Sequence, residues 1–315
     1  RIDGAKKTYD DKGELIVEEH YKNGLPEGAF TQYREGKVIR LTTYKDGKLD
    51  GKSARYTDKG VPDYETFYKD GKKEGEWKYY DDEGKVERIE TYKNDEKNGK
   101  WWRKMVSNHG NYTTTKYYTN GKPSGKWVDQ WENGLLREER DYKDEKAYTQ
   151  RNYHLNGNPK SEVSYKDDKL HGARKNFNGA GVLQDEQVFD ADKLIARKIY
   201  HSNGRLKEET NYKNDEKNGK YSLYNENGTL SEEGEYKNDF KEGVWREYQE
   251  NNVLYRERTY VGGILNGAMK IYYPSKKVKE EGMMKENYKQ GIWKHYDRTG
   301  RLAYEEEYQQ GTVVK

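Results

Sequence analysis

The feature that most constrains the fold is a degenerate repeat of about 24 residues, which runs through the whole chain. Thirteen repeats fit one frame, and consecutive repeats begin 23 to 26 residues apart. A repeat this short cannot bury its own apolar surface, so neighbouring repeats have to stack on one another. The repeats begin at Gly4, Gly28, Gly51, Gly75, Gly99, Gly125, Tyr148, Gly172, Ile195, Gly219, Gly243, Gly267 and Gly291.

Four sequence columns recur within this frame, and together they predict one β-hairpin per repeat. A Gly usually opens the repeat, an aromatic residue often follows two positions later, and a second Gly stands near the middle. Eight positions after the second Gly there is an aromatic residue in twelve of the thirteen repeats. Segments such as Asn-Glu-Asn-Gly at 225–228 are typical of turns, because Gly and a preceding Asn or Asp tolerate a positive φ. The flanking segments alternate as strands do, and Gly recurs too often for a helix.

These columns predict an all-β chain that folds as an elongated, single-layer antiparallel meander, a solenoid of about 13 β-hairpins. Two strands per repeat at about 4.8 Å each would make a ribbon on the order of 100 Å long, and such a sheet should twist. We expect residues 1–315 to form one continuous array. Because the chain begins at Arg1 rather than at Met, we also expect that a segment precedes it.

The composition favours a thin structure without a deep core. Hydrophobic residues make up only 31% of the chain and the mean hydropathy is −1.45, yet Tyr alone contributes 31 residues. A disordered chain would be poor in aromatic residues, whereas Tyr can pack its ring and leave its hydroxyl in water. The 60 basic and 57 acidic residues nearly balance, which argues against nucleic acid as a partner. There is no Cys, and no segment is apolar enough to cross a membrane.

The sequence resembles the MORN repeat family, in its longer bacterial variant. The matching signature stands here as Gly-Glu-Trp-Lys-Tyr-Tyr at 75–80, Gly-Lys-Val at 84–86 and Tyr-Lys-Asn at 92–94. The resemblance covers almost the whole chain and implies an elongated antiparallel sheet, often curved or grooved. It also implies a binding or scaffolding role, because bacterial members are often described as antitoxin-like or lie at the cell surface, and it suggests contact with lipids. The chain departs from the pattern in its longer fifth repeat and at Tyr148, Ile195, Asn252 and Lys276.

A Glu recurs five positions after the mid-repeat Gly position in ten of the thirteen repeats. One interpretation is an acidic track for a basic partner. The favoured interpretation is a cross-strand ladder with Lys and Arg on the adjacent strands, because acids and bases are so evenly matched. The column consists of Glu18, Glu65, Glu139, Glu162, Glu186, Glu209, Glu233, Glu257, Glu281 and Glu305.

Tryptophan is concentrated in repeats four to six, where we predict the partner-binding residues. Exposed Trp often anchors an interface, although three of these residues occupy the repeated aromatic column and have a structural interpretation as well. The same region holds a two-residue insertion within 103–111, and insertions in repeats usually form loops on one face, often the binding face. The candidate residues are Trp77, Trp101, Trp102, Trp127, Trp131 and Tyr112.

No arrangement of residues in the sequence is typical of catalysis or of metal binding. The six His are scattered without metal-ligand spacing, and there is neither a nucleophile elbow nor a Gly-rich phosphate loop. A thin sheet also offers little burial with which to shift a pKa. We therefore expect no enzymatic activity, no cofactor and no metal.

The function expected from the sequence is that of a non-catalytic binding or scaffold module of bacterial type, which presents an extended β-sheet surface. A protein partner is favoured, and a glycan or a lipid headgroup stays open. The alternatives are an antitoxin-like or immunity-like neutraliser of a toxin and a binder of lipid headgroups or cell-wall ligands. We expect an extracellular or cell-envelope location and consider end-to-end self-association.

Overall fold

The computed structural model describes residues 2–315, and every regular element in this range is a β-strand. Its contacts divide the chain into two compact units, Arg1–Gly157 and Asn158–Lys315, which are described separately. Arg1, on which the expected preceding segment depends, lies outside the described residues. The continuity of one array over residues 1–315 stays a prediction.

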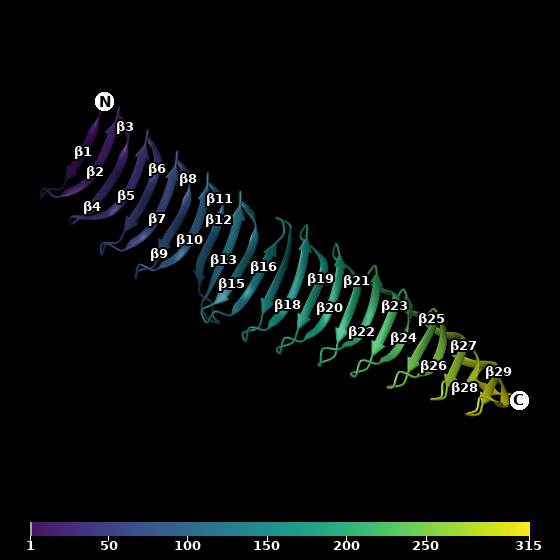
Figure 1. Ribbon diagram of the computed structural model, residues 1–315. Helices are drawn as coiled ribbons and strands as arrows, with labels where there is room; N and C mark the ends of the chain where they lie inside the picture. Colours follow the sequence, from purple (N-terminus) through teal and green to yellow (C-terminus); the bar gives the residue numbers. More distant parts are fainter. Residues whose placement is uncertain (1) are drawn as a thin grey trace. The chain divides into compact units, whose positions relative to one another are not determined.

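The first unit contains seventeen strands, which Figure 1 shows in chain order. They are β1 (Gly4–Tyr9), β2 (Leu15–Lys22), β3 (Leu25–Pro26), β4 (Gly28–Arg34), β5 (Lys37–Lys45), β6 (Lys48–Tyr56), β7 (Pro62–Lys69), β8 (Lys72–Lys73), β9 (Gly75–Tyr80), β10 (Val86–Lys93), β11 (Glu96–Lys97), β12 (Gly99–Met105), β13 (Tyr112–Thr119), β14 (Lys122–Pro123), β15 (Gly125–Trp131), β16 (Leu136–Tyr142) and β17 (Ala147–Tyr153).

The second unit continues with fourteen strands. They are β18 (Pro159–Lys166), β19 (Lys169–Phe177), β20 (Leu183–Asp190), β21 (Lys193–Tyr200), β22 (Leu206–Lys213), β23 (Glu216–Tyr224), β24 (Leu230–Lys237), β25 (Phe240–Tyr248), β26 (Leu254–Val261), β27 (Ile264–Tyr272), β28 (Val278–Lys285), β29 (Tyr288–Tyr296), β30 (Leu302–Gln309) and β31 (Thr312–Val313).

Each unit is a single-layer antiparallel meander, as the sequence predicts. Strands pair with their neighbours along the chain, for example β9 with β10 through Trp77 opposite Glu90, and β25 with β26 through Trp245 opposite Arg258. The described strands number 31 rather than the expected 26. Four repeats in the first unit have a two-residue strand separated from the longer strand that begins at the opening Gly, and β31 follows the last turn.

Two kinds of turn alternate along each meander. In the mid-repeat turn the Gly has a positive φ, as at Gly228 (φ 88°), and Asn252 and Lys276 adopt the same conformation where Gly is missing; only in the second repeat of the described chain does the preceding residue, Glu35 (51°), share it. Asn227 does not share it; its side chain instead accepts a hydrogen bond from the Thr229 amide (2.9 Å). The turn between repeats usually has two consecutive residues with positive φ, such as Asn238 (52°) and Asp239 (68°), the turn at 143–146 being an exception. This pattern is that of a type I′ turn, which matches the twist of the strands it joins.

The opening Gly of the repeat lies inside the strand pairing and has a positive φ wherever it occurs. At Gly267 φ is 134°, and an added Cβ would come within 2.9 Å of the Thr259 Cβ. The Thr259 hydroxyl also donates to the Ala268 carbonyl (3.0 Å). The Gly column therefore marks a bulge in the strand pairing, and at Gly267 the adjacent strand also approaches closely.

Among the described residues, most of the buried hydrophobic side chains are aromatic, and these rings lie on one face of each unit. Trp77 is 6% exposed, Trp245 1% and Trp293 0%. The face that carries these rings is called the aromatic face. In the first unit neighbouring rings contact one another, with centroids 4.8 to 5.6 Å apart. The series is Tyr68, Trp77, Tyr92, Trp101, Tyr118, Trp127, Tyr142 and Tyr148.

Candidate binding groove on the aromatic face

The three candidate Trp residues of the aromatic column are built into the sheet. The indole N–H groups of Trp77, Trp101 and Trp127 donate to backbone carbonyls ten residues earlier, at 2.9, 3.0 and 2.8 Å. Trp245 and Trp293 make the same bond in the second unit, at 3.1 Å each. Because the contact recurs wherever the column holds Trp, it belongs to the repeat fold, which supports the structural interpretation of these three residues.

Trp102 lies on the opposite face of the sheet from Trp101, because successive strand residues point to opposite sides. Its neighbours across the strand pairing are Ile89 and Thr115. These two residues hold the position that is Glu in ten other repeats. The six candidate residues therefore do not form one site.

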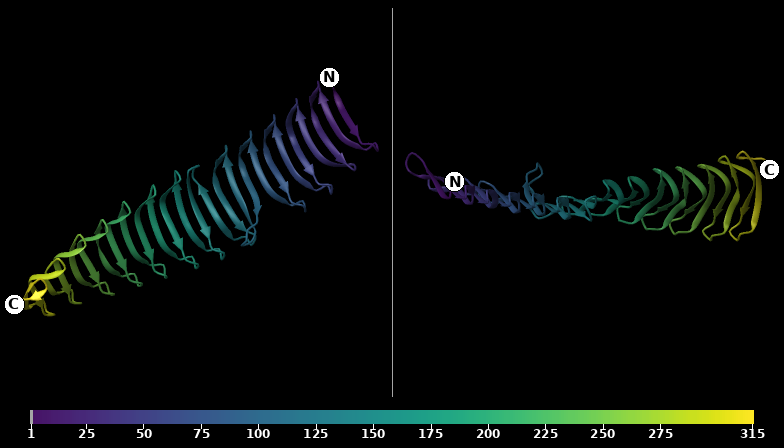
Figure 2. Two further views of the ribbon diagram at one scale, coloured as in Figure 1. Left: turned by 180° about the vertical axis from the view of Figure 1, so that it is seen from behind. Right: turned by 90° about the horizontal axis from the view of Figure 1, so that it is seen from above.

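The two-residue insertion lengthens the hairpin formed by β12 and β13. Its pairing is regular up to Met105 opposite Tyr112, without the bulge that the mid-repeat turn introduces in β9 and β10. Val106–Asn111 form the connecting loop, whose first residue is 85% exposed. In the right-hand view of Figure 2, a loop that rises from the sheet has the blue that the colour bar gives for these residues.

The longer hairpin places Tyr112 beside Trp131 of β15. The two residues are paired in the sheet, and their rings meet edge to face with centroids 5.7 Å apart. The Arg137 guanidinium lies over both rings, 4.3 Å from Tyr112 and 5.6 Å from Trp131, and is held by Asp129 at 2.9 Å. The structure thus brings together these two candidates, on the same face as Trp101 and Trp127.

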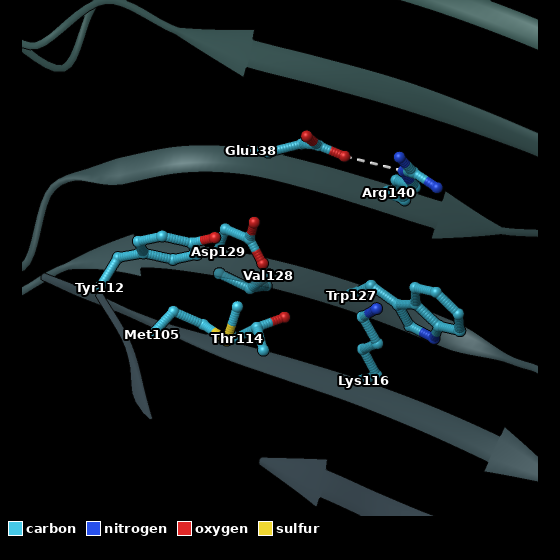
Figure 3. Close-up of a pocket in the computed structure, with 9 residues that line it drawn as sticks. All are labelled: Met105, Tyr112, Thr114, Lys116, Trp127, Val128, Asp129, Glu138 and Arg140. Atoms are coloured by element: carbon cyan, nitrogen blue, oxygen red, sulfur yellow. Dashed lines mark hydrogen bonds and ion pairs between the residues drawn. The ribbon is translucent and has the colours of Figure 1, made fainter. Parts of the chain in front are cut away.

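Two adjoining hollows of ≈ 190 and ≈ 300 Å³ open on this face. They share Met105, Thr114 and Lys116, so we treat them as one groove, which crosses β10, β12, β13, β15 and β16. Figure 3 shows the part between Tyr112 and Trp127. The first hollow is lined by Met105, Tyr112, Thr114, Lys116, Trp127, Val128, Asp129, Glu138 and Arg140, and the second by Arg88, Ile89, Glu90, Lys97, Trp101, Trp102, Arg103, Met105, Thr114, Lys116 and Tyr118.

Basic side chains outnumber acidic ones along the groove. Arg88 and Arg140 each have a carboxylate partner two residues away in the same strand, at 3.6 and 2.8 Å. For Lys97, Arg103 and Lys116, residues 2–315 contain no carboxylate within ion-pair distance. Lys97 instead lies over the rings of Trp101 and Tyr118 (4.4 and 4.9 Å), and Lys116 lies 4.9 Å from the Trp127 ring centre. The groove therefore combines aromatic walls with cations that lack a counter-charge.

The Glu column forms the opposite face, called the carboxylate face, and the contacts there support the cross-strand ladder. Glu281 pairs with Lys270 (3.2 Å) and accepts a hydrogen bond from the Tyr296 hydroxyl (2.8 Å), and these contacts lower the pKa of Glu281. Glu233 accepts from Tyr248 (2.7 Å), and burial together with this bond raises the pKa of Tyr248 to about 12. Equivalent Tyr–Glu bonds occur at Tyr80–Glu65, Tyr153–Glu139, Tyr200–Glu186 and Tyr272–Glu257.

Sequence reasoning missed two structural columns. A Lys two positions before the opening Gly covers the aromatic rings, as Lys241 does over Trp245 (3.7 Å) and Lys289 over Trp293 (4.0 Å). The Tyr five positions after the opening Gly is the hydroxyl donor to the Glu column. Both columns are visible in the aligned repeats, but their contacts connect different strands and cannot be read from spacing alone.

The structure reveals neither a metal cluster nor a membrane-spanning helix in the range that it describes. Over residues 2–315, no three His, Asp or Glu side chains come together as a metal site would require. No helix in that part of the chain is long and apolar enough to cross a membrane.

The fold, together with the contacts that recur from repeat to repeat, defines an all-β protein that is built of stacked hairpin repeats. The family model of the MORN repeat variant matches the chain eight times, over more than half of its length, and the chain belongs to this family. The matches cover residues 2–23, 73–94, 149–167, 195–214, 217–238, 241–261, 265–286 and 289–310.

Comparison with curated proteins gives no match. Among solved structures, the chain is similar to the Photorhabdus luminescens Tc holotoxin pore in a mutated form, with 12% identity and a TM-score of 0.20. It is also similar to the TcdB2-TccC3-Cdc42 complex, with 11% identity and a TM-score of 0.19. The alignments cover 97% and 98% of this chain but only 22% of each of the two larger chains. TM-scores this low carry no argument about the chain.

Proposed function

We propose that the chain is a non-catalytic binding and scaffold module, and that it holds a protein partner in the groove of repeats four to six. The observation that carries the proposal is the break in the repeat at this place. The end of the lengthened hairpin at Met105 and Tyr112, the Tyr112–Trp131 pair and three cations without a carboxylate partner in residues 2–315 meet on the aromatic face. Regular repeats stabilise the array. A local insertion that interrupts the regular repeat without adding to this stabilisation favours a binding role.

The proposal is tested by capturing partners from an extract of the source cells with the full chain. Tyr112→Ala combined with Trp131→Ala removes the aromatic end of the groove, and Phe67→Ala combined with Tyr117→Ala, two exposed aromatic residues that do not line the groove, serves as the control. The first variant should lose the captured partner, and the control should keep it. If both variants retain every partner, or if only the control variant loses one, the groove is not the binding surface.

A further inference from the structure

We infer that the groove binds an acidic, extended segment of the partner protein, whose carboxylates replace counter-ions that the repeat itself supplies elsewhere. This inference rests on the proposed binding function and names the chemistry of the partner. It starts from a comparison of equivalent positions in different repeats.

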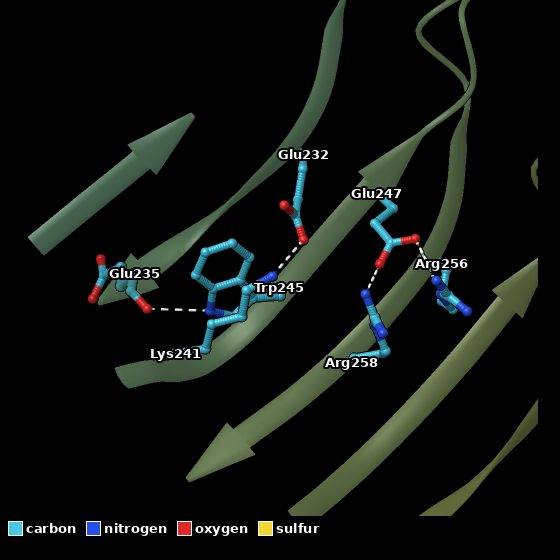
Figure 4. A network of polar contacts seen from close by, with 7 residues as sticks. All are labelled: Glu232, Glu235, Lys241, Trp245, Glu247, Arg256 and Arg258. Atoms are coloured by element: carbon cyan, nitrogen blue, oxygen red, sulfur yellow. Dashed lines mark hydrogen bonds and ion pairs between the residues drawn. The ribbon is translucent and has the colours of Figure 1, made fainter. Parts of the chain in front are cut away.

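In two repeats of the second unit, the Lys above the aromatic column forms an ion pair with a Glu of the preceding strand. Lys241 lies over Trp245 and contacts Glu232 at 2.6 Å, as Figure 4 shows. Lys289 has the same arrangement with Glu280. The Glu stands four positions after the mid-repeat Gly position in both cases.

At Lys97 this carboxylate is replaced by a cation. The position equivalent to Glu232 is Arg88, which lines the groove beside Lys97. A second position shows the same replacement. Arg103 stands where another repeat has Glu247, which pairs with two Arg residues of its own repeat. Since the same backbone accommodates carboxylates at these positions in other repeats, the fold does not require the cations here. The reversal of charge favours recognition of an external anion.

Three kinds of anionic partner fit the groove less well than a peptide. A bilayer surface is flat, whereas Arg88 and Lys116 are half-buried in the hollows. A sugar ring needs an open aromatic face, but Lys97 and Lys116 cover Trp101 and Trp127. Nucleic acid needs a long basic surface, and the chain as a whole has only +3.

An extended peptide can present several carboxylates to these cations along one side. Neighbouring strands lie about 4.8 Å apart, and alternate side chains of an extended peptide lie about 6.8 Å apart on one side. The difference of about 2 Å per step lies within the reach of long Arg, Lys and Glu side chains, so carboxylates on one side of such a peptide can contact cations of β10, β12 and β13. The repeat already shows the geometry of the contact, since Glu232 approaches a ring-bound Lys to 2.6 Å.

The test measures binding of a fluorescent peptide of about twelve residues in which Glu alternates with Thr. Its matched control carries Gln in place of Glu. The groove variant combines Arg103→Glu with Lys116→Thr, because Glu247 and Thr210 hold the equivalent positions in other repeats of the same fold. The charge-matched control variant combines Lys48→Glu with Lys72→Thr, two exposed lysines near turns outside the groove. The urea midpoint of each variant shows that it is folded.

The Glu peptide should bind the wild-type chain at least about tenfold more tightly than the Gln peptide, and added salt should weaken it. The groove variant should lose this preference, and the control variant should keep it. Equal binding of both peptides, or equal effects of both variants, would overturn the inference. Stronger binding to a sulfated polysaccharide, or to vesicles of phosphatidylglycerol and phosphatidylcholine in equal parts, would overturn it in favour of another anion. If capture from cell extract still depends on Tyr112 and Trp131 while the Glu peptide fails, the proposed function stands and only the acidic chemistry is wrong.

Discussion

Gly234 lies directly against the indole ring of Trp245, and no room is left for a Cβ at this position. Gly282 has the same relationship to Trp293 two repeats later. These two Trp residues are 1% and 0% exposed, whereas Trp101 and Trp127, which face Lys116 and other long side chains, are only half-buried. The burial of a Trp in this fold therefore depends on the size of the residue that it covers on the adjacent strand.

Substitution of this Gly should destabilise the second unit. Gly234→Ala forces the Trp245 ring out of its position, and overpacking of this kind costs about 1–3 kcal/mol. The measurement is the urea midpoint followed by Trp fluorescence. Gly179→Ala is the matched control, because an added Cβ there meets no atom within 4 Å and φ is not positive. Equal midpoints for the two variants would contradict the predicted contact.

Trp77 and Trp102 should differ sharply in their contribution to stability. Trp77 is 6% exposed and lies between the rings of Tyr68 and Tyr92, so Trp77→Ala should cost about 3–5 kcal/mol. Trp102 is half-buried and outside the ring series, so its removal should cost about 1 kcal/mol. Urea unfolding of both variants checks this difference. A larger loss for Trp102→Ala would show that the carboxylate face holds the first unit together.

The hydrogen bond between Tyr272 and Glu257 should appear as a coupling energy. The hydroxyl lies 2.6 Å from the carboxylate, and a double-mutant cycle of Tyr272→Phe and Glu257→Gln should yield about 1 kcal/mol. Tyr273 is the neighbouring control, because its hydroxyl donates to the Tyr296 carbonyl instead (2.8 Å). The cycle of Tyr273→Phe with Glu257→Gln should be additive. Coupling of similar size in both cycles would contradict a specific Tyr–Glu bond.

The stability of the fold should decrease in alkali. Burial and the bonds to Glu65, Glu186 and Glu233 raise the pKa of Tyr80, Tyr200 and Tyr248 from 10.0 to about 12. The folded state holds these protons more tightly than the unfolded state does. Their contribution to the free energy of unfolding is therefore complete below pH 10 and is lost between pH 10 and about 12. The urea midpoint and the tyrosinate absorbance should be measured across this range.

The control for the alkaline loss is Tyr248→Phe, which removes one of these protons. This variant should lose less stability than the wild type over the same pH range. A midpoint that stays constant to pH 12 would show that the Tyr hydroxyls titrate as they do in the unfolded chain.

The fold could be predicted from the sequence because its signals are local and repeated thirteen times. Turn residues fix each hairpin, and the spacing of the Gly and aromatic columns fixes its length. The bulge at the opening Gly was not predicted, because it arises from the pairing with the adjacent strand, as in the register shift between Arg258 and Tyr260 opposite Leu265–Met269. Contacts of this kind depend on register, which the frame of the repeats does not specify.

The candidate site could be located only in part. The excess of Trp and the insertion pointed to repeats four to six, where the groove lies. The sequence could not separate Trp102 from Trp131, because the face on which a residue lies depends on the bulges between it and its neighbour. The cations Lys97, Arg103 and Lys116 were also missed, since each is ordinary in a chain with 60 basic residues. They stand out only in the structure, where they line the groove and have no carboxylate of residues 2–315 within ion-pair distance.

The lengthened hairpin of β12 and β13 has a consequence for how such arrays diversify. Its extra residues enter at a mid-repeat turn, and β15 still pairs with β13 through Tyr112 and Trp131. The next hairpin keeps its bulge and turn residues, because β15 pairs with β16 in the same register as the corresponding strands of other repeats. A lineage can therefore acquire, lose or relocate a recognition element one repeat at a time, and selection on that element leaves the remaining repeats free to drift.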